Sequence, residues 1–138
     1  MQRCPCCNAR LSAASLCPRC GAELDRAMRC ESLAKLWLSV SLQMLDADQA
    51  DIAVAAVQRS LSFKQTQEAR VFRDFLVQHQ YQALYRHLEH NQWQEARQTL
   101  TRLRVLQGES EALRRFLELI EHLELASQVS TIPTDNIA

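Results

Sequence analysis

A chain of 138 residues has room for one domain and a small additional module. Its 16 basic and 16 acidic side chains give a formal net charge of zero, which argues against wholesale nucleic-acid binding through phosphate neutralisation. Only two glycines and three prolines occur, and no proline interrupts residues 22–131. This composition predicts a mostly helical chain.

Two copies of the pattern C-P-x-C lie close together near the N-terminus. Cys4 and Cys7 belong to the first copy, Cys17 and Cys20 to the second, and nine residues separate the copies. A C-x2-C turn lets two sulfurs converge on one cation at about 2.3 Å, while backbone N–H groups of the turn face the thiolates. The spacing therefore predicts a structural Zn²⁺ site with these four cysteines as ligands.

The residue after each pair, Asn8 or Gly21, can take the left-handed conformation that closes such a turn. With these turns, residues 4–24 resemble a short zinc ribbon, a family of two facing C-P-x-C-G knuckles. Zinc ribbons occur in nucleic-acid proteins, enzymes and adaptors, so the resemblance implies a metal and no particular function. The knuckles are also similar to those of rubredoxins, although a much longer chain separates them there, and an iron tetrathiolate is therefore one alternative. Redox-active or structural free thiols are another.

Two further cysteines are not expected to bind this metal. Cys6 lies between two ligands and is predicted to be a turn residue, with a reactive or alternate-ligand thiol as the other interpretation. Cys30 lies in a helical pattern and is predicted to be a small buried apolar residue. The N-terminus lacks the apolar segment of a secretory signal, which predicts a cytoplasmic protein with reduced thiols.

Apolar residues recur at three- and four-residue steps through most of the remaining chain. They predict helices over 25–45, 66–90 and 93–106, one between Asp48 and a break at 62–66, and one from Ser110 to about 126. Asp48 is predicted to cap the second helix, and Asn91 with Gln94 resembles a capping box for the fourth. The first helix is interrupted by polar residues and is not expected to span a membrane.

A weak internal repeat links these helices. A shift of 43 positions aligns Gln49 with Gln92 and Ala53 with Ala96, and a small alanine lets a paired helix approach closely. Residues 91–103 resemble the second helix of a tetratricopeptide repeat. The resemblance implies tetratricopeptide-like hairpins, with an irregular bundle as the alternative, because the step exceeds the usual length of about 34 residues. The predicted domains are a zinc ribbon at 1–25, a helical domain at 26–126 and a flexible tail at 127–138.

The sequence carries no phosphate loop, no G-x-S-x-G turn and no H-E-x-x-H motif, so no enzymatic activity is expected. The predicted function is a protein-protein interaction adaptor, scaffold or assembly factor. The alternatives are a nucleic-acid-associated regulator that uses Arg3, Arg10 and Arg19, and a rubredoxin-like iron electron carrier. Tyr81 and Tyr85 lie one turn apart on a predicted helix, where they are either core residues or anchors for a partner peptide.

Overall fold

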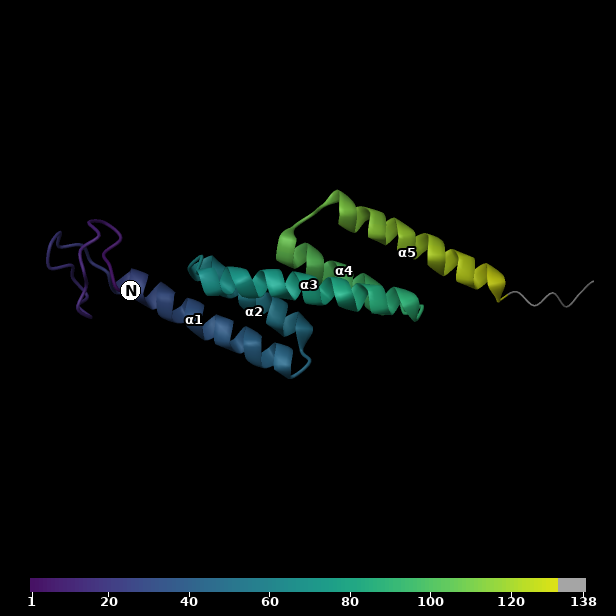
Figure 1. Ribbon diagram of the computed structural model, residues 1–138, viewed down its shortest axis with the longest axis horizontal. Helices are drawn as coiled ribbons and strands as arrows, with labels where there is room; N and C mark the ends of the chain where they lie inside the picture. The colour runs from purple at the N-terminus through teal and green to yellow at the C-terminus, as the bar shows by residue number, and fades with distance from the viewer. Residues whose placement is uncertain (132–138) are drawn as a thin grey trace, which may run out of the picture. The chain divides into compact units, whose positions relative to one another are not determined.

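A computed structural model describes residues 1–131 and shows a mostly helical chain (Figure 1). The helices in this range are α1 (Asp25–Asp46), α2 (Ala50–Phe63), α3 (Gln67–Glu89), α4 (Trp93–Gln107) and α5 (Glu111–Ser130). Residues 1–24, which precede α1, contain two isolated antiparallel bridges, Arg3 with Arg10 and Leu16 with Glu23. The predicted fold class, mostly α with an N-terminal cysteine module, is confirmed.

The chain divides into two compact units, residues 1–72 and 73–138, and the division falls within α3. The first unit contains the cysteine module, α1 and α2, and the second contains most of α3 with α4 and α5. The three-part division into 1–25, 26–126 and 127–138 stays a prediction. Of the predicted tail, residues 132–138 lie outside the described residues.

Helix α5 ends at Ser130 and not near residue 126 as its apolar pattern predicts. Polar side chains accompany the extra turn: Ser127 Oγ donates to Glu124 O at 2.8 Å and Ser130 Oγ donates to Ala126 O at 3.0 Å. Hydroxyl groups that bond back to the preceding turn are compatible with helix at a solvent-exposed end. The end of this helix was therefore not visible in the apolar periodicity.

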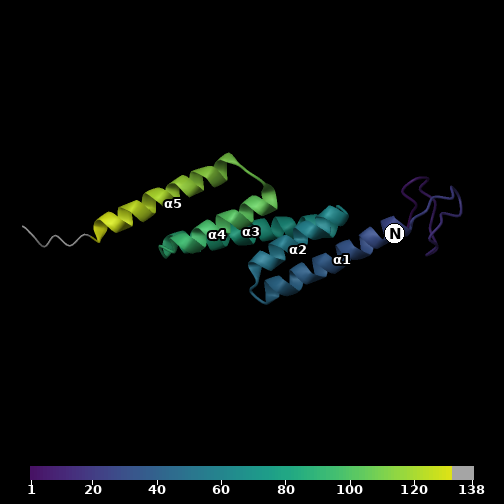
Figure 2. The same ribbon diagram turned by 180° about the vertical axis from the view of Figure 1, so that it is seen from behind.

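Helices α1 and α2 lie side by side in both views of the chain (Figures 1 and 2). Two buried serines bond across this hairpin in opposite directions. Ser41 Oγ of α1 donates to Ala53 O of α2 at 2.6 Å, and Ser60 Oγ of α2 donates to Ala34 O of α1 at 2.7 Å. Because all four side chains are small, the backbones approach closely enough for a hydroxyl to reach the opposite helix. Ala53 is fully buried, as its predicted place at a helix crossing requires.

The turn between α1 and α2 and the turn between α3 and α4 have the same backbone hydrogen bonds at the 43-residue offset. The equivalent bonds are Asp48 N to Leu45 O (3.1 Å) with Asn91 N to Leu88 O (3.3 Å), and Gln49 N to Met44 O (2.8 Å) with Gln92 N to His87 O (2.9 Å). Both turns also contain one left-handed residue, with φ of 59° at Asp48 and 55° at Asn91. The sequence repeat is thus also a repeat of local backbone structure.

These turns correct two predicted helix caps. Asp48 does not cap α2 and Asn91 does not cap α4, because the N-cap residues are Gln49 and Gln92, and neither makes a side-chain cap bond. Asp and Asn tolerate the left-handed conformation better than most residues, so Asp48 and Asn91 close the preceding helix one position before the N-cap of the next. The predicted start of α5 is confirmed, since Ser110 Oγ accepts a hydrogen bond from Leu113 N at 3.3 Å.

The second unit has its own apolar core, built from the later part of α3 together with α4 and α5. Its buried members are Leu84, Ala96, Leu100, Leu103, Leu113 and Ile120. Full burial of one leucine or isoleucine contributes about 1.5–3 kcal/mol, so this cluster holds the three helix segments together. An ion pair between Arg97 and Glu124 also joins α4 to α5, and it raises the pKa of the Arg97 guanidinium.

Candidate metal centre

The two C-P-x-C segments fold into knuckles with the same backbone bonds. In the first knuckle, Cys4 N donates to Ala9 O at 2.9 Å and Asn8 N donates to Cys4 O at 2.9 Å. In the second, the equivalent bonds are Cys17 N to Ala22 O at 3.0 Å and Gly21 N to Cys17 O at 2.9 Å. Asn8 and Gly21 have φ of 60° and 73°, so each closes its turn in the left-handed conformation that the sequence predicts.

The knuckles bring four sulfur atoms together. Cys4 Sγ lies 3.6 Å from Cys20 Sγ, Cys7 Sγ lies 3.6 Å from Cys17 Sγ, and all four atoms lie within 4.8 Å of one another. Four thiolates at about 2.3 Å from a tetrahedral ion would be about 3.8 Å apart. The donor set therefore fits one tetrahedral metal ion, and it consists of the four cysteines that the spacing singles out.

The start of α1 supports this cluster. Cys4, Cys17 and Leu24 are buried together, and Met28 in the first turn of α1 packs against them. Met28 N also donates to Leu24 O at 2.9 Å, which joins the module to the helix backbone. The apolar contacts of the module are few, so a bound ion would contribute much of the energy that holds residues 1–24 in this shape.

Backbone N–H groups lower the pKa values of the cluster thiols, whereas burial raises them. At Cys17, the N–H groups of Cys20 and Arg19 favour the thiolate and lower the pKa to about 6. At Cys20, the N–H of Ala22 favours the thiolate, but burial and the neighbouring thiols outweigh it and raise the pKa to about 12. One thiol is therefore ready to receive a cation at neutral pH, whereas another must lose its proton when the cation binds.

The remaining cysteines and the histidines lie outside the cluster. Cys6 is exposed in the first knuckle, where partial desolvation of its sulfur and the charge of nearby Cys4 raise its pKa. Cys30 is partly exposed on α1 and not fully buried as expected from its helical pattern. Within residues 1–131, the group able to hold a metal consists of cysteines alone.

The two tyrosines, Tyr81 and Tyr85, differ in their exposure to solvent. Tyr81 is partly buried against the core of the second unit, and its hydroxyl accepts a hydrogen bond from Gln107 Nε2 at 2.8 Å. Tyr85 is 51% exposed, and its ring forms a T-shaped pair with Phe116, with 6.0 Å between ring centroids. Tyr81 therefore has a structural role, whereas Tyr85 presents much of its ring to solvent.

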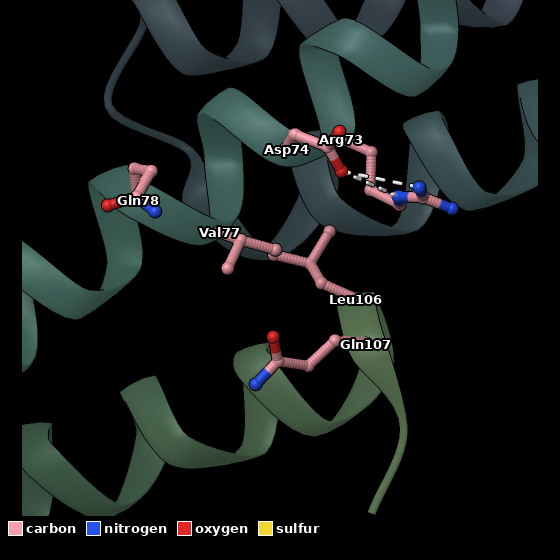
Figure 3. A pocket seen from close by; sticks show the side chains of 6 residues that line it. All are labelled: Arg73, Asp74, Val77, Gln78, Leu106 and Gln107. Carbon is pink, nitrogen blue, oxygen red and sulfur yellow. Dashed lines mark hydrogen bonds and ion pairs between the residues drawn. The ribbon is translucent and has the colours of Figure 1, made fainter.

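A cavity of about 430 Å³ lies between α3 and the end of α4, and one of its lining residues, Gln107, donates the hydrogen bond to the Tyr81 hydroxyl (Figure 3). Its lining combines apolar and polar side chains: Arg73, Asp74, Val77, Gln78, Leu106 and Gln107. Figure 3 shows Arg73 and Asp74 joined by their ion pair, at 3.2 Å, at one end of this lining. Sequence reasoning missed this cavity, because its two walls come from the early part of α3 and the end of α4.

The chain is thus a mostly helical protein with an N-terminal tetracysteine cluster that can hold a metal ion. Comparisons with models of protein families, with curated proteins and with solved structures find no match. Among the helices of residues 1–131, none combines the length and the apolar character needed to cross a lipid bilayer.

Proposed function

We propose that the protein is a non-enzymatic cytosolic adaptor whose N-terminal module is held by one structural Zn²⁺ and whose helices bind a protein partner. The observation that carries the proposal is the four-sulfur cluster, with closest separations of 3.6 Å. Cys4, Cys7, Cys17 and Cys20 would hold the ion, and the backbone N–H groups of the turns would stabilise the thiolates. The ion would supply folding energy to a module that is too small for a core of its own.

Zinc is preferred over iron in this proposal because the two knuckles are separated by only nine residues, as in the short zinc ribbon that they resemble. Metal analysis of the purified protein tests the choice directly. We expect about one zinc per chain and no visible colour. An iron tetrathiolate would colour the protein and would instead favour an electron carrier. Protein without bound metal and with all thiols freely titratable would contradict both.

The partner is proposed to bind at the surface around Tyr85, with Tyr81 and Gln107 supporting it from the core side. The accessible ring of Tyr85 and a cavity of about 430 Å³ in the same unit favour an extended or helical peptide that inserts an apolar side chain. Aromatic rings with one exposed face are suited to this role, because they bury much area with few rotatable bonds.

Affinity capture from the cytosol in moderate salt tests the adaptor role. We expect Tyr85→Ala to lose the captured partner without loss of folding stability. The matched control is Leu36→Ala, which removes an apolar side chain of similar exposure (57%) from α1 in the other unit. Equal capture by the two variants would exclude the Tyr85 surface. A captured complex that is sensitive to nuclease and falls apart steeply with salt would favour the nucleic-acid alternative.

A further inference from the structure

Two arginines face each other in the first knuckle. Arg3 and Arg10 are partners in an isolated antiparallel bridge. Residues directly opposite in such a pair have Cα atoms about 4.5–5.5 Å apart and side chains on the same face, and like charges in this position destabilise the pairing. The second knuckle has Leu16 and Glu23 at the equivalent bridge and therefore lacks this repulsion.

The repulsion is not relieved by neighbouring acids. Arg3 donates from its guanidinium to the carbonyl of Asn8 at 3.2 Å, which uses one of its five N–H groups. Within the part of the chain that the structure describes, neither Arg3 nor Arg10 has a carboxylate partner. Both side chains are exposed, so their remaining N–H groups are accessible to a ligand from solvent.

Both arginines line one small cavity. Its volume is about 280 Å³, and its other lining residues are Gln2 and Leu11. Leu11 N donates to Gln2 O at 3.0 Å, so a backbone bond connects the two ends of the lining. Ligand pockets usually measure about 300–1,000 Å³, so this cavity suits a small polar group and not a large cofactor.

We propose that the cavity between Arg3 and Arg10 binds a single phosphomonoester group. A guanidinium presents a planar fork of N–H groups that matches two phosphate oxygens, and two such forks can hold one tetrahedral group. A phosphomonoester carries a charge of about −1.5 to −2 at pH 7, which balances two arginines. A carboxylate or one phosphodiester carries a single charge and would leave part of the repulsion in place.

A different role for these arginines is to offset the negative charge of a tetrathiolate metal centre. The two roles differ in what a variant should do. If the arginines only offset the metal charge, removing one should weaken metal retention, and the unaltered protein should show no saturable phosphate binding. If they bind phosphate, the metal should stay and the phosphate should be lost.

Calorimetric titration of the zinc-loaded full chain tests the proposal, with inorganic phosphate and phenyl phosphate as probes at pH 7.5 and constant ionic strength. We expect saturable binding of one phosphate per chain. Arg10→Gln should weaken it at least about 10-fold, because it removes one charged fork. Arg10→Glu should abolish it, and this change should be tolerated because Glu23 occupies the equivalent position in the second knuckle. The matched control is Arg19→Gln at the tip of the second knuckle, which should change the affinity less than about twofold.

Zinc content and helical circular dichroism are measured for every variant, so that lost phosphate binding is not confused with unfolding. Heat input that does not saturate, or equal affinities for the Arg10 and Arg19 variants, would overturn the proposal. So would loss of zinc from Arg10→Gln when the unaltered protein shows no saturable phosphate binding, which would assign the arginines to the metal centre. These outcomes do not depend on whether an adaptor partner exists.

A second set of titrations identifies the source of the phosphate group. The probes are a phosphoserine peptide with otherwise neutral residues, its unphosphorylated twin and a single-stranded oligothymidylate. Tighter binding of the phosphopeptide than of inorganic phosphate would assign the site to a phosphorylated protein, and equal binding would assign it to free phosphate. Binding of the oligonucleotide alone, weakened equally by Arg10→Gln and Arg19→Gln, would replace the phosphomonoester site with a nucleic-acid surface.

Discussion

Asn8 and Gly21 close the two knuckles at equivalent positions, with φ of 60° and 73°. No atom outside the neighbouring residues lies within 4 Å of a Cβ built at Gly21, so the conformation and not the available space limits substitution there. Asparagine visits the left-handed region more readily than most residues, whereas a β-branched residue is strained in it.

We therefore expect Gly21→Asn to retain the metal as well as the unaltered protein does, because Asn8 already holds the same place in the first knuckle. Gly21→Val should cost about 1–3 kcal/mol and lose metal to a chelator at a lower chelator concentration. Chelator competition on the two variants measures the difference. Equal retention by Asn and Val would show that the left-handed turn does not limit the site.

Cys17 is a buried member of the four-sulfur cluster with a pKa lowered to about 6, and we expect it to be essential for metal binding. Cys17→Ser should reduce the metal content from about one ion per chain to nearly none, because a tetrahedral site loses one of its thiolates. The helices should remain, since residues 1–24 contain no helix. Elemental analysis and far-ultraviolet circular dichroism measure the two effects.

The controls for Cys17→Ser are Cys6→Ser and Cys30→Ser, whose sulfur atoms lie outside the four-sulfur cluster. Each should leave the metal content unchanged. Loss of metal from either control, at the level seen for Cys17→Ser, would show that the ligand assignment is wrong.

The thiol pKa values also predict how many protons leave when the metal binds. At pH 7 Cys17, with a pKa of about 6, is mostly ionised, while Cys20, with a pKa of about 12, is protonated. Metal binding should therefore release at least one proton and fewer than four. Because binding favours the thiolates, affinity should fall as pH is lowered, and more steeply once Cys17 becomes protonated below about pH 6. Calorimetry in buffers of different ionisation enthalpy counts the protons, and a release of four would contradict the ionised state of Cys17.

At the scale of secondary-structure elements, the hairpin of α1 and α2 depends on small residues at the helix crossing. Ala53 is fully buried there, and its carbonyl accepts the hydrogen bond of Ser41. A larger side chain at this place would push the helices apart and lengthen the bonds that both serines make. The neighbouring Ala55 is exposed on the same helix.

Ala53→Leu should lower the free energy of unfolding by about 1–3 kcal/mol or more, because overpacking forces the backbones to separate. Ala55→Leu adds the same side chain to α2 at an exposed position and should change stability by less than about 0.5 kcal/mol. Urea unfolding followed by circular dichroism gives both values. A neutral Ala53→Leu would mean that the close crossing is not required for the hairpin.

The local repeat extends through several elements. Helices α1 and α3 end in turns with the same hydrogen bonds, and α5 begins 43 positions after Glu68 in the first turn of α3. A recurring turn of this kind arises when each helix pair ends its first helix with one left-handed residue at the equivalent position, here Asp48 and Asn91. Whether the hairpins form a tetratricopeptide-like array stays a prediction.

At the scale of the whole molecule, the metal should control residues 1–24 and leave the helices intact. A chelator should increase amide hydrogen exchange throughout the knuckles, since their buried apolar cluster is small. Protection should persist in α2 and α4, which carry the largest groups of buried residues in the two units. Hydrogen exchange with and without chelator measures this, and a simultaneous loss of protection in all helices would show that the metal holds the entire chain.

The amino-acid sequence by itself determined the features that rest on local spacing. The four cysteines could be assigned because they lie within residues 4–20 and converge through two short turns that depend on few distant contacts. The helices could be placed because one buried face recurs every three to four residues. The repeat at 43 positions was also visible, because each turn between helices is formed by a few residues that are close in the sequence.

Only the tertiary structure decided which faces are covered and which groups meet. In the structure, Asp48 and Asn91 close the preceding helix and do not cap the next one. The geometry of the turn, and not the side-chain oxygen alone, sets where the next helix starts. The tertiary structure left Tyr81 partly buried, with its hydroxyl bonded to Gln107, and Tyr85 half exposed, although the two rings lie one turn apart and both contact Phe116. It also set Arg3 opposite Arg10, since pairing within a knuckle depends on how the turn folds back.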